Sequence, residues 1–304
     1  MQKIVPHLWF DNQAKEAAEF YVSAFGKDSK ITGSTTIHHT PTGDVDTVTF
    51  DLLGYSFLAI SAGPHFTINP SISFFVNFDP SQDGNARKNL DTLWDILSEG
   101  GTELMPLQEY PFSPLYGWIQ DRFGLSWQLI LSDPEGEPRP DIVPSLLFTG
   151  NVCGKAEEAT EFYLSVFNNT RRGLMARYPA GMEPDKEGTI MYTDIKLEGE
   201  WFAAMDSAQE HAFEFNEAIS LMVYCDTQDE IDYYWEKLKA GGDPAAQQCG
   251  WLKDKYGVSW QVAPRLLGDM IINGNPEQIA RVTQTFLPMK KLDIAELQRA
   301  YDPT

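Results

Sequence analysis

The stretch GWIQDRFGLSWQ at residues 117–128 returns as GWLKDKYGVSWQ at residues 250–261. The two copies agree at both glycines, both tryptophans, the aspartate, the serine and the glutamine. A match of this length does not arise from amino-acid composition alone. It indicates that the chain is a duplication, and internal repetition of this kind has to be recognised before any single element is assigned.

Two shorter matches confirm the order of the repeat. Residues 4–6 (IVP) recur at residues 142–144, and residues 14–21 (AKEAAEFY) recur at residues 155–163 (KAEEATEFY). The period is roughly 135 to 140 residues, which is the size of a whole domain and not of a solenoid unit. A chain of 304 residues is long enough for two such domains, each with its own core.

The repeat divides the chain into four parts. We predict a first domain at residues 1–132 and a second at residues 142–265. Residues 133–141 join them as a polar, Pro-rich and semi-rigid linker. Residues 266–304 have no counterpart in the first half, and we predict a helical tail there. The tail either packs on the chain as an appendage or forms the contact of a homodimer.

Within each repeat the apolar residues alternate, change to helical spacing and then alternate again in three short runs. Residues 3–10 and 71–78 begin two such modules in the first repeat. Each module is predicted to hold one strand, one helix and three strands, and the fold class is α+β. The helices predicted by this spacing are residues 13–25, residues 86–98, residues 155–167, one that begins after Thr227, and two in the tail that begin after Asn275 and at Asp293.

The charge of the chain restricts its partners. Asp and Glu outnumber Lys and Arg by 44 to 23, which gives a formal net charge of −21. Such a field repels phosphate backbones and anionic lipid, so we expect neither nucleic acid nor a membrane surface as a partner. No apolar run approaches the roughly 20 residues of a membrane-spanning helix.

The three cysteines favour a reducing compartment. Cys153, Cys225 and Cys249 are odd in number and all lie in the second half, although the first half follows the same pattern without any. This argues against a disulfide framework and suits the cytoplasm. The N-terminus lacks the apolar core of a signal peptide, because Trp9-Phe10 runs directly into Asp11.

Several of these motifs occur together in one protein family. The patterns Pro-x-Leu-x-Phe, Ala-x-Glu-Phe-Tyr and Gly-Trp-x-x-Asp-x-x-Gly-x-Ser-Trp-Gln resemble the PhnB-like branch of the vicinal oxygen chelate superfamily. That branch is often labelled 3-demethylubiquinone-9 3-methyltransferase-like, and the superfamily also holds glyoxalase I, bleomycin-resistance proteins and extradiol dioxygenases. The resemblance covers nearly the whole chain. It implies tandem domains with four βαβββ modules, one pair in each repeat, that form half-open curled sheets with helices on the outer face.

The resemblance also implies where a metal would bind. Active members of the superfamily hold a divalent metal with His, Glu or Gln side chains that converge on the concave strands. The alternation on the last strand turns Trp127 toward the helices and Gln128 toward the cleft, and the same holds for Gln261. The polar cleft positions are His7, Ser73 and Gln128 in the first repeat and Ser145, Ser220 and Gln261 in the second.

This set of side chains is poor in metal ligands. A neutral amide is a weaker ligand than a carboxylate, and serine stands at three of the other four positions. We therefore expect no cofactor and no stoichiometric metal. His7 and Gln128 would be the ligands of any divalent metal that does bind.

The aromatic residues indicate a ligand site of another kind. The chain holds 8 Trp and 18 Phe, and aromatic walls with a few polar groups suit a flat or apolar small molecule. Aromatic residues fill protein cores equally well. The segment Pro111–Tyr116, stiffened by two prolines, is predicted as a wall or lid of the first cleft. The aromatic candidates for ligand contact are Trp9, Tyr116, Trp118, Trp201 and Trp251.

Three classes of function remain open at this point. The first is a metal-free protein that binds a small, partly apolar ligand, and the second is a metal-dependent lyase, isomerase or dioxygenase of the superfamily. The third is a protein that works as an assembly with one structural domain. A methyltransferase gains no support, because no Gly-rich loop links a strand to a helix as nucleotide-type cofactors require. No catalytic residue can be named from the sequence.

The two clefts are expected to differ. The framework motif is shared by both repeats, whereas His7 faces Ser145 at the equivalent cleft position. We therefore predict that one cleft binds ligand and that the other is partly filled by its own side chains or by the tail. The first repeat, which has the Pro111–Tyr116 segment, is the better candidate for the ligand.

Overall fold

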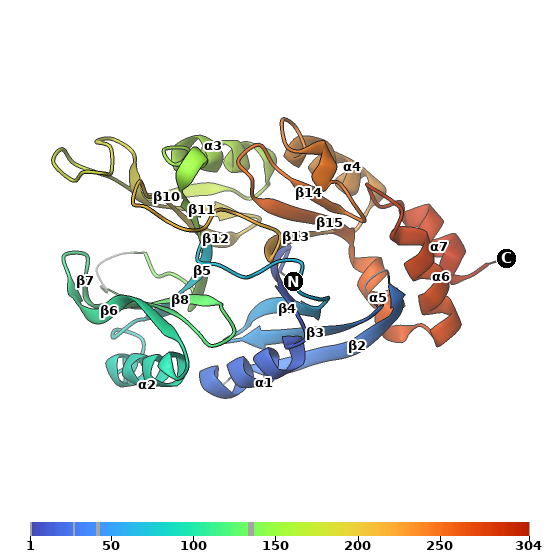
Figure 1. Ribbon diagram of the computed structural model, residues 1–304, viewed down its shortest axis with the longest axis horizontal. Coiled ribbons are helices and arrows are strands. Elements are labelled where there is room, and N and C mark those ends of the chain that lie inside the picture. The colour runs from blue at the N-terminus through green and yellow to red at the C-terminus, as the bar shows by residue number, and fades with distance from the viewer. Residues whose placement is uncertain (1, 27, 41–42, 133–136, 304) are drawn as a thin grey trace. The chain divides into compact units, whose positions relative to one another are not determined.

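The computed structural model describes residues 2–26, 28–40, 43–132 and 137–303, so residues 133–136 of the predicted linker lie outside the described part. The chain divides into two compact units (Figure 1). Unit 1 comprises Met1–Ser23, Asp28–Ile68 and Asn216–Thr304, and unit 2 comprises Ala24–Lys27 and Asn69–Phe215. Each unit carries one sheet. In the part of the chain that the structure describes, no helix is long and apolar enough to cross a membrane.

Unit 1 contains a seven-stranded sheet in the order β14-β15-β13-β1-β4-β3-β2. Strand β1 pairs antiparallel with β13 and parallel with β4, which places strands from both ends of the sequence at its centre. Its elements are β1 (Ile4–Phe10), α1 (Ala14–Phe25), β2 (Lys30–Thr40), β3 (Gly43–Leu52), β4 (Tyr55–Ser61), β13 (Ile219–Cys225), α4 (Gln228–Leu238), β14 (Trp251–Lys253) and β15 (Ser259–Pro264). The last two residues of α1 belong to unit 2.

Unit 2 contains an eight-stranded sheet in the order β10-β11-β12-β9-β5-β8-β7-β6. Here β5 and β9 form the central antiparallel pair. Its elements are β5 (Ile72–Phe78), α2 (Ala86–Ser98), β6 (Thr102–Tyr110), β7 (Ser113–Gln120), β8 (Ser126–Leu131), β9 (Ile142–Phe148), α3 (Ala156–Val166), β10 (Arg171–Arg177), β11 (Ile190–Leu197) and β12 (Glu200–Asp206).

The pairing of modules differs from the prediction. Strand β1 of the first repeat pairs with β13 of the second, and β5 of the first pairs with β9 of the second. The prediction that each repeat closes over its own two modules is therefore wrong. The physical reason is that equivalent strands have equivalent pairing edges, so an internal repeat shows which segments are alike but not which copies pair. The boundaries given for the two repeats remain a prediction about the sequence.

The repeated motif forms a turn around a buried aspartate. The Asp121 carboxylate accepts hydrogen bonds from the backbone N–H groups of Phe123 (2.8 Å) and Leu125 (3.1 Å). It also accepts one from the indole Nε1 of Trp127, at 2.8 Å. Since Asp121 is only 4% exposed, these charge-assisted bonds form away from water, where they fix both the turn and the ring.

The second copy of the motif builds the same turn. Asp254 is 2% exposed and holds two backbone N–H groups and the Nε1 of Trp260 at 2.8, 3.1 and 2.9 Å. Gly124 and Gly257 have φ of 88° and 86°, a left-handed conformation that glycine adopts without strain. Turn geometry therefore explains why both copies share the second glycine, the aspartate and the second tryptophan of the motif.

Each turn decides which face of its sheet a side chain occupies. The fully buried Trp127 packs its ring against Phe25 and Phe74, with centroids 5.0 and 5.6 Å apart. Helix α2 contacts β8, and α4 contacts β15, on this same outer side. Because strand side chains alternate, Gln128 then lies on the opposite face. We call the face opposite the helices α1–α4 the inner face of each sheet.

The four modules begin at β1, β5, β9 and β13, and the fourth differs from the other three. After α4 it has a short 3-10 turn, Pro244–Ala246, where the others have their first outer strand, and only β14 and β15 follow. The β6–β7 hairpin thus has no counterpart there. The sequence agrees, because no stretch before Gly250 resembles Pro111–Tyr116.

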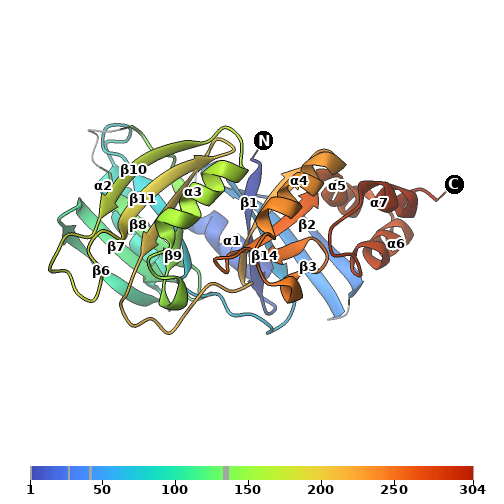
Figure 2. The ribbon, with the colours of Figure 1, turned by 90° about the horizontal axis from the view of Figure 1, so that it is seen from above.

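The tail forms three helices: α5 (Arg265–Asn273), α6 (Pro276–Phe286) and α7 (Ile294–Tyr301) (Figure 2). Asn275 makes a full capping box with Gln278, and Asp293 caps α7, so the two predicted tail helices are confirmed. Helix α5 was not predicted, because Pro264 at its N-cap offers no side-chain cap.

The buried aspartate can be tested by mutation. We expect Asp121→Ala to lower the free energy of unfolding by about 3 kcal/mol, since it leaves buried N–H donors without an acceptor. Asp121→Asn keeps one acceptor oxygen and should lose less, and Asp254→Ala should resemble Asp121→Ala. Urea unfolding followed by Trp fluorescence measures the change. An equal effect of Asp95→Ala, at an exposed position of α2, would contradict this role.

Candidate functional site

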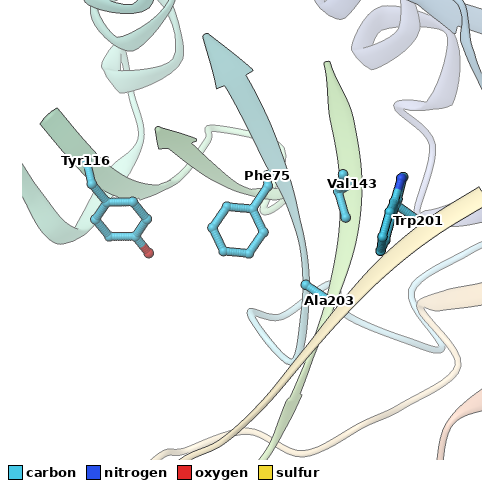
Figure 3. Packing of buried hydrophobic residues seen from close by; sticks show 5 residues of the cluster. All are labelled: Phe75, Tyr116, Val143, Trp201 and Ala203. Carbon is cyan, nitrogen blue, oxygen red and sulfur yellow. The ribbon is translucent and has the colours of Figure 1, made fainter. Parts of the chain in front are cut away.

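The inner face of unit 2 is lined by aromatic and apolar side chains. Figure 3 shows Phe75 from β5, Tyr116 from β7, Val143 from β9, and Trp201 and Ala203 from β12. All five are buried and form one cluster. The partly buried side chains packed against it are Met105, Tyr110, Trp118, Ile130, Tyr192 and Met205.

A chain of hydrogen bonds crosses this apolar face. The Tyr116 hydroxyl donates to Oε1 of Gln128 at 2.6 Å, and Nε2 of Gln128 donates to Oγ of Ser73 at 2.7 Å. Burial raises the pKa of Tyr116, so its hydroxyl stays protonated and keeps this donor role. Ser73 lies directly opposite Ser145 across the β5–β9 pair. The predicted residues Ser73, Gln128 and Ser145 thus meet in one place.

Three polar atoms of this face have no hydrogen-bond partner among the described residues. They are the Oγ of Ser126, the Oγ of Ser145 and the Nε1 of Trp118, and all three are buried. A buried polar group in this state costs about 1–3 kcal/mol. A bound molecule with one or two oxygen atoms could accept hydrogen bonds from these groups.

A charged group that the sequence did not reveal borders the same face. The guanidinium of Arg139 lies 3.8 Å from the ring centroid of Trp201, and its Nε donates to Asp194 at 2.8 Å. Asp194 is buried and also accepts from the backbone N–H of Leu174 (2.6 Å) and the Tyr192 hydroxyl (3.2 Å). Arg139 belongs to the linker, where no motif marks it, so only the fold could bring it to Trp201.

The inner face of unit 1 holds the remaining polar candidates. His7 lies directly opposite Ser220, whose Oγ accepts from Nε2 of Gln261 at 2.9 Å. The edge of the His7 ring meets Trp251, with centroids 5.3 Å apart. Burial lowers the pKa of His7 to about 3, so the ring is neutral, and its Nδ1 has no hydrogen-bond partner among the described residues.

Trp9 has a structural environment in unit 1. Its Nε1 donates to the carbonyl oxygen of Gly63 at 2.8 Å. Its ring packs edge-on against Phe66 and Trp251, with centroids 5.1 and 6.2 Å apart. These contacts hold the segment after β4 against β1.

The tail covers part of the inner face of unit 1. Leu292 is buried in one cluster with Met222 and Ala263, which lie on the same faces of β13 and β15 as Ser220 and Gln261. The sequence predicted such filling for the cleft of a single repeat, whereas this face combines strands from both repeats. The partly buried side chains around this cluster are Leu58, Tyr224, Leu267, Phe286 and Met289.

Two predictions about the clefts need correction. His7, Ser73 and Gln128 were grouped as one site of the first repeat, but His7 lies in unit 1 and the other two lie in unit 2, because the modules pair across repeats. The segment Pro111–Tyr116 is no separate lid, since residues 113–116 begin β7 and only Pro111-Phe112 turn the β6–β7 hairpin.

The donor set does not fit the divalent metal that the superfamily resemblance implies. Among the residues that the structure describes, no group of three or more His, Cys, Asp or Glu side chains could hold an ion. Unit 1 brings together one imidazole, one hydroxyl and one amide, and unit 2 brings together hydroxyls and an amide. Such sets lack the charged or multiple nitrogen ligands that zinc, iron or nickel sites use.

The sequence profile of the 3-demethylubiquinone-9 3-methyltransferase family matches residues 2–130 and again residues 140–263. The chain belongs to this family. A PhnB protein from Bacillus cereus, described as a 3-demethylubiquinone-9 3-methyltransferase, is 34% identical over 43% of this chain and 100% of its own, with a TM-score of 0.38. No curated protein matches the chain.

Two solved structures connect the family to the vicinal oxygen chelate fold. Glyoxalase I from Zea mays has a TM-score of 0.54 at 12% identity, over 84% of this chain and 90% of its own. A Bacillus subtilis protein described as a dioxygenase has a TM-score of 0.51 at 11% identity, over 98% and 96%. At this identity the similarity shows the fold alone, and the fold predicted from the sequence motifs is confirmed.

The neutral His7 makes a testable contribution to pH dependence. Its pKa is about 3 in the folded chain against about 6.5 in an unfolded one, so the unfolded state binds the extra proton between these values. Stability from this group is complete above about pH 6.5 and falls by roughly 1.4 kcal/mol per pH unit as the pH drops toward 3.

His7→Ser, which introduces the residue found at the equivalent position 145, removes this titration. We expect the variant to be less stable at pH 7 but to lose less stability than the wild type between pH 6.5 and 4.5. Urea midpoints at both pH values measure the difference. Equal losses in the two proteins would show that His7 does not carry the proton linkage.

Proposed function

We propose that this protein binds a small, partly apolar molecule on the inner face of unit 2 and does so without a metal. The observation that carries the proposal is a set of buried polar atoms in an aromatic wall, above all Trp118 Nε1 and Ser145 Oγ, for which the described residues offer no hydrogen-bond partner. A ligand that is mostly apolar, with a carbonyl or hydroxyl oxygen, matches both features.

The geometry of the wall indicates a flat molecule. Phe75, Tyr116 and Trp201 offer ring faces and edges from three strands (Figure 3). Aromatic pairs favour offset or edge-to-face packing, so a planar ligand gains from each ring that it meets. The hydrogen bonds from Tyr116 to Gln128 and from Gln128 to Ser73 fix the orientation of these three side chains.

A metal-dependent lyase, isomerase or dioxygenase is the alternative. It is supported by the fold shared with proteins described as glyoxalase I and a dioxygenase. The neutral donor sets on both inner faces speak against it. The methyltransferase activity in the family description is not assigned to this chain, because the sequence lacks the Gly-rich loop of nucleotide-type cofactors.

Other properties of the chain agree with a binding role in the cytoplasm. Cys153, Cys225 and Cys249 are free thiols, as a reducing compartment permits. The formal charge of −21 disfavours nucleic acid and anionic membranes as partners. A homodimer through the tail stays a prediction.

The ligand site can be probed with prodan, a neutral, flat naphthyl ketone whose emission reports the polarity around it. We expect saturable binding and about fivefold weaker affinity in Trp118→Phe, since one hydrogen bond is worth about 1 kcal/mol. The matched control is Trp251→Phe, at the equivalent position of unit 1, which should bind prodan like the wild type. Equal weakening in both variants would contradict a site in unit 2.

The metal-free state has its own test. We expect less than about 0.1 equivalent of Ni, Zn, Fe or Mn per chain when the protein is purified without chelator, because neither donor set suits these ions. Plasma mass spectrometry of the protein, together with His7→Ala, measures this. About one equivalent that disappears in His7→Ala would show that the metal-dependent alternative is the better one.

A further inference from the structure

The tail lies directly beside the polar positions of the unit 1 inner face. Met222 is opposite Gln261 across the β13–β15 pair, and Leu58 is opposite His7 across the β1–β4 pair. Met222 and Leu58 both pack in the cluster that holds Leu292 of the tail. The tail therefore covers the apolar half of a face whose polar half is His7, Ser220 and Gln261.

The tail is attached where the fourth module lacks its first outer strand. Residues just before the edge strand β14 hydrogen-bond to the tail backbone, as a neighbouring strand would. A few side chains of α4 complete the attachment. These contacts are Cys249 N–H to the Met289 carbonyl (2.6 Å), Gly250 N–H to the Lys290 carbonyl (2.7 Å), Gln228 Nε2 to the Leu292 carbonyl (3.1 Å), Ile294 N–H to Gln228 Oε1 (2.9 Å) and the ion pair Lys291–Asp232 (2.7 Å).

The tail also has a small core of its own. Met270, Val282 and Leu297 come from α5, α6 and α7 and form a separate buried cluster. Arg281 ties α6 to the end of α7 by bonds to the carbonyl oxygens of Ala300 (2.8 Å) and Tyr301 (3.0 Å). These contacts join the tail helices to one another, and Leu267 and Phe286 pack against both this cluster and the one around Leu292 on the inner face.

We propose that the tail is an intramolecular occupant of a second binding site, and that its release opens the unit 1 inner face to a small apolar molecule carrying an oxygen atom. Leu292, Met289 and Phe286 stand in for the apolar part of that molecule. Nothing in the described part of the tail satisfies the polar part, since Nδ1 of His7, a residue that is 3% exposed, has no hydrogen-bond partner there. A carbonyl or hydroxyl oxygen of a ligand would meet this nitrogen in one tautomer or the other.

The first measurement asks whether the tail separates from the sheet. Leu292→Ser removes its main apolar contact, and Gln228→Ala removes two hydrogen bonds to its backbone while leaving tail and inner face unchanged. The matched control is Ile272→Ser, a 60% exposed residue of α5. We expect iodoacetamide to alkylate Cys249 about tenfold faster in Leu292→Ser than in the wild type, which corresponds to about 1.4 kcal/mol of lost docking free energy.

Alkylation of Cys249 is a suitable signal because burial raises the pKa of its thiol to about 11, so the docked state reacts slowly. Peptide mass spectrometry separates it from Cys153 in unit 2, whose rate should not change. Gln228→Ala should also raise the rate of Cys249 alkylation, but by a smaller factor, and Ile272→Ser should leave this rate unchanged. An unchanged Cys249 alkylation rate in both Leu292→Ser and Gln228→Ala overturns the proposal, because the tail is then no separable occupant.

The second measurement counts prodan sites on the full-length protein. Leu292→Ser should bind one more prodan per chain than the wild type, and Ala263→Trp, which fills the inner face beside Leu292, should remove that extra site. Faster Cys249 alkylation without an extra site overturns the proposal, as does an extra site that survives Ala263→Trp. A wild type that binds no prodan while Leu292→Ser binds one would support the second site and contradict the proposed function of unit 2.

Discussion

The buried aspartate of each repeated turn is the constraint on which both inner faces depend. Asp121 holds the indole of Trp127 on the helix side, and the residue that follows must then point the other way. Gln128 thereby reaches Ser73, and by the same turn around Asp254, Gln261 reaches Ser220. The turn at the centre of the motif, residues 121–125, carries none of the candidate ligand-binding residues. It sets the register of the strand that carries them, which explains why the framework is shared while the residues around it differ.

The sequence predicted the elements better than their assembly. Alternation found the strands at residues 3–10 and 71–78 within one residue of β1 and β5. Helical spacing found α2 at residues 86–98 at its observed bounds, because both signals are local. Strand pairing is not local, and two copies of one module offer the same edge to either partner. The exchange of modules between repeats, with β1 on β13 and β5 on β9, therefore lay beyond any pattern in the sequence. Helix α5 was missed for a simpler reason, since it starts without a capping side chain.

The candidate site follows the same division. Alternation placed Ser73 and Gln128 in one cleft, and they do meet. It assigned Ser145 to the other cleft, although Ser145 lies opposite Ser73. It could not place Arg139 on Trp201, because a linker has no period to read. It also could not separate His7 from Gln128, since that required knowing which modules pair. The sequence predicted the side chains whose direction follows from strand alternation. It did not predict contacts that depend on which distant segments of the chain pair.

Both inner faces present the same physical difficulty, which is an aromatic and apolar surface that water would otherwise cover. In unit 1 a segment of the tail covers this surface, since Leu292 and its neighbours bury Met222 and Ala263. Unit 2 covers it with side chains of its own, where Tyr110 and the 61% exposed Phe112 pack on Tyr116, at 5.4 and 5.1 Å between ring centroids. Neither cover satisfies the polar atoms beneath it, Nδ1 of His7 in one unit and Oγ of Ser145 in the other. A cover that buries apolar atoms but leaves buried nitrogen and oxygen atoms without hydrogen bonds keeps the desolvation cost of those polar atoms. A small molecule with both apolar and polar surface would complete either cover, and for this reason we propose a site on each inner face, closed by the tail in unit 1 and by side chains of the sheet in unit 2.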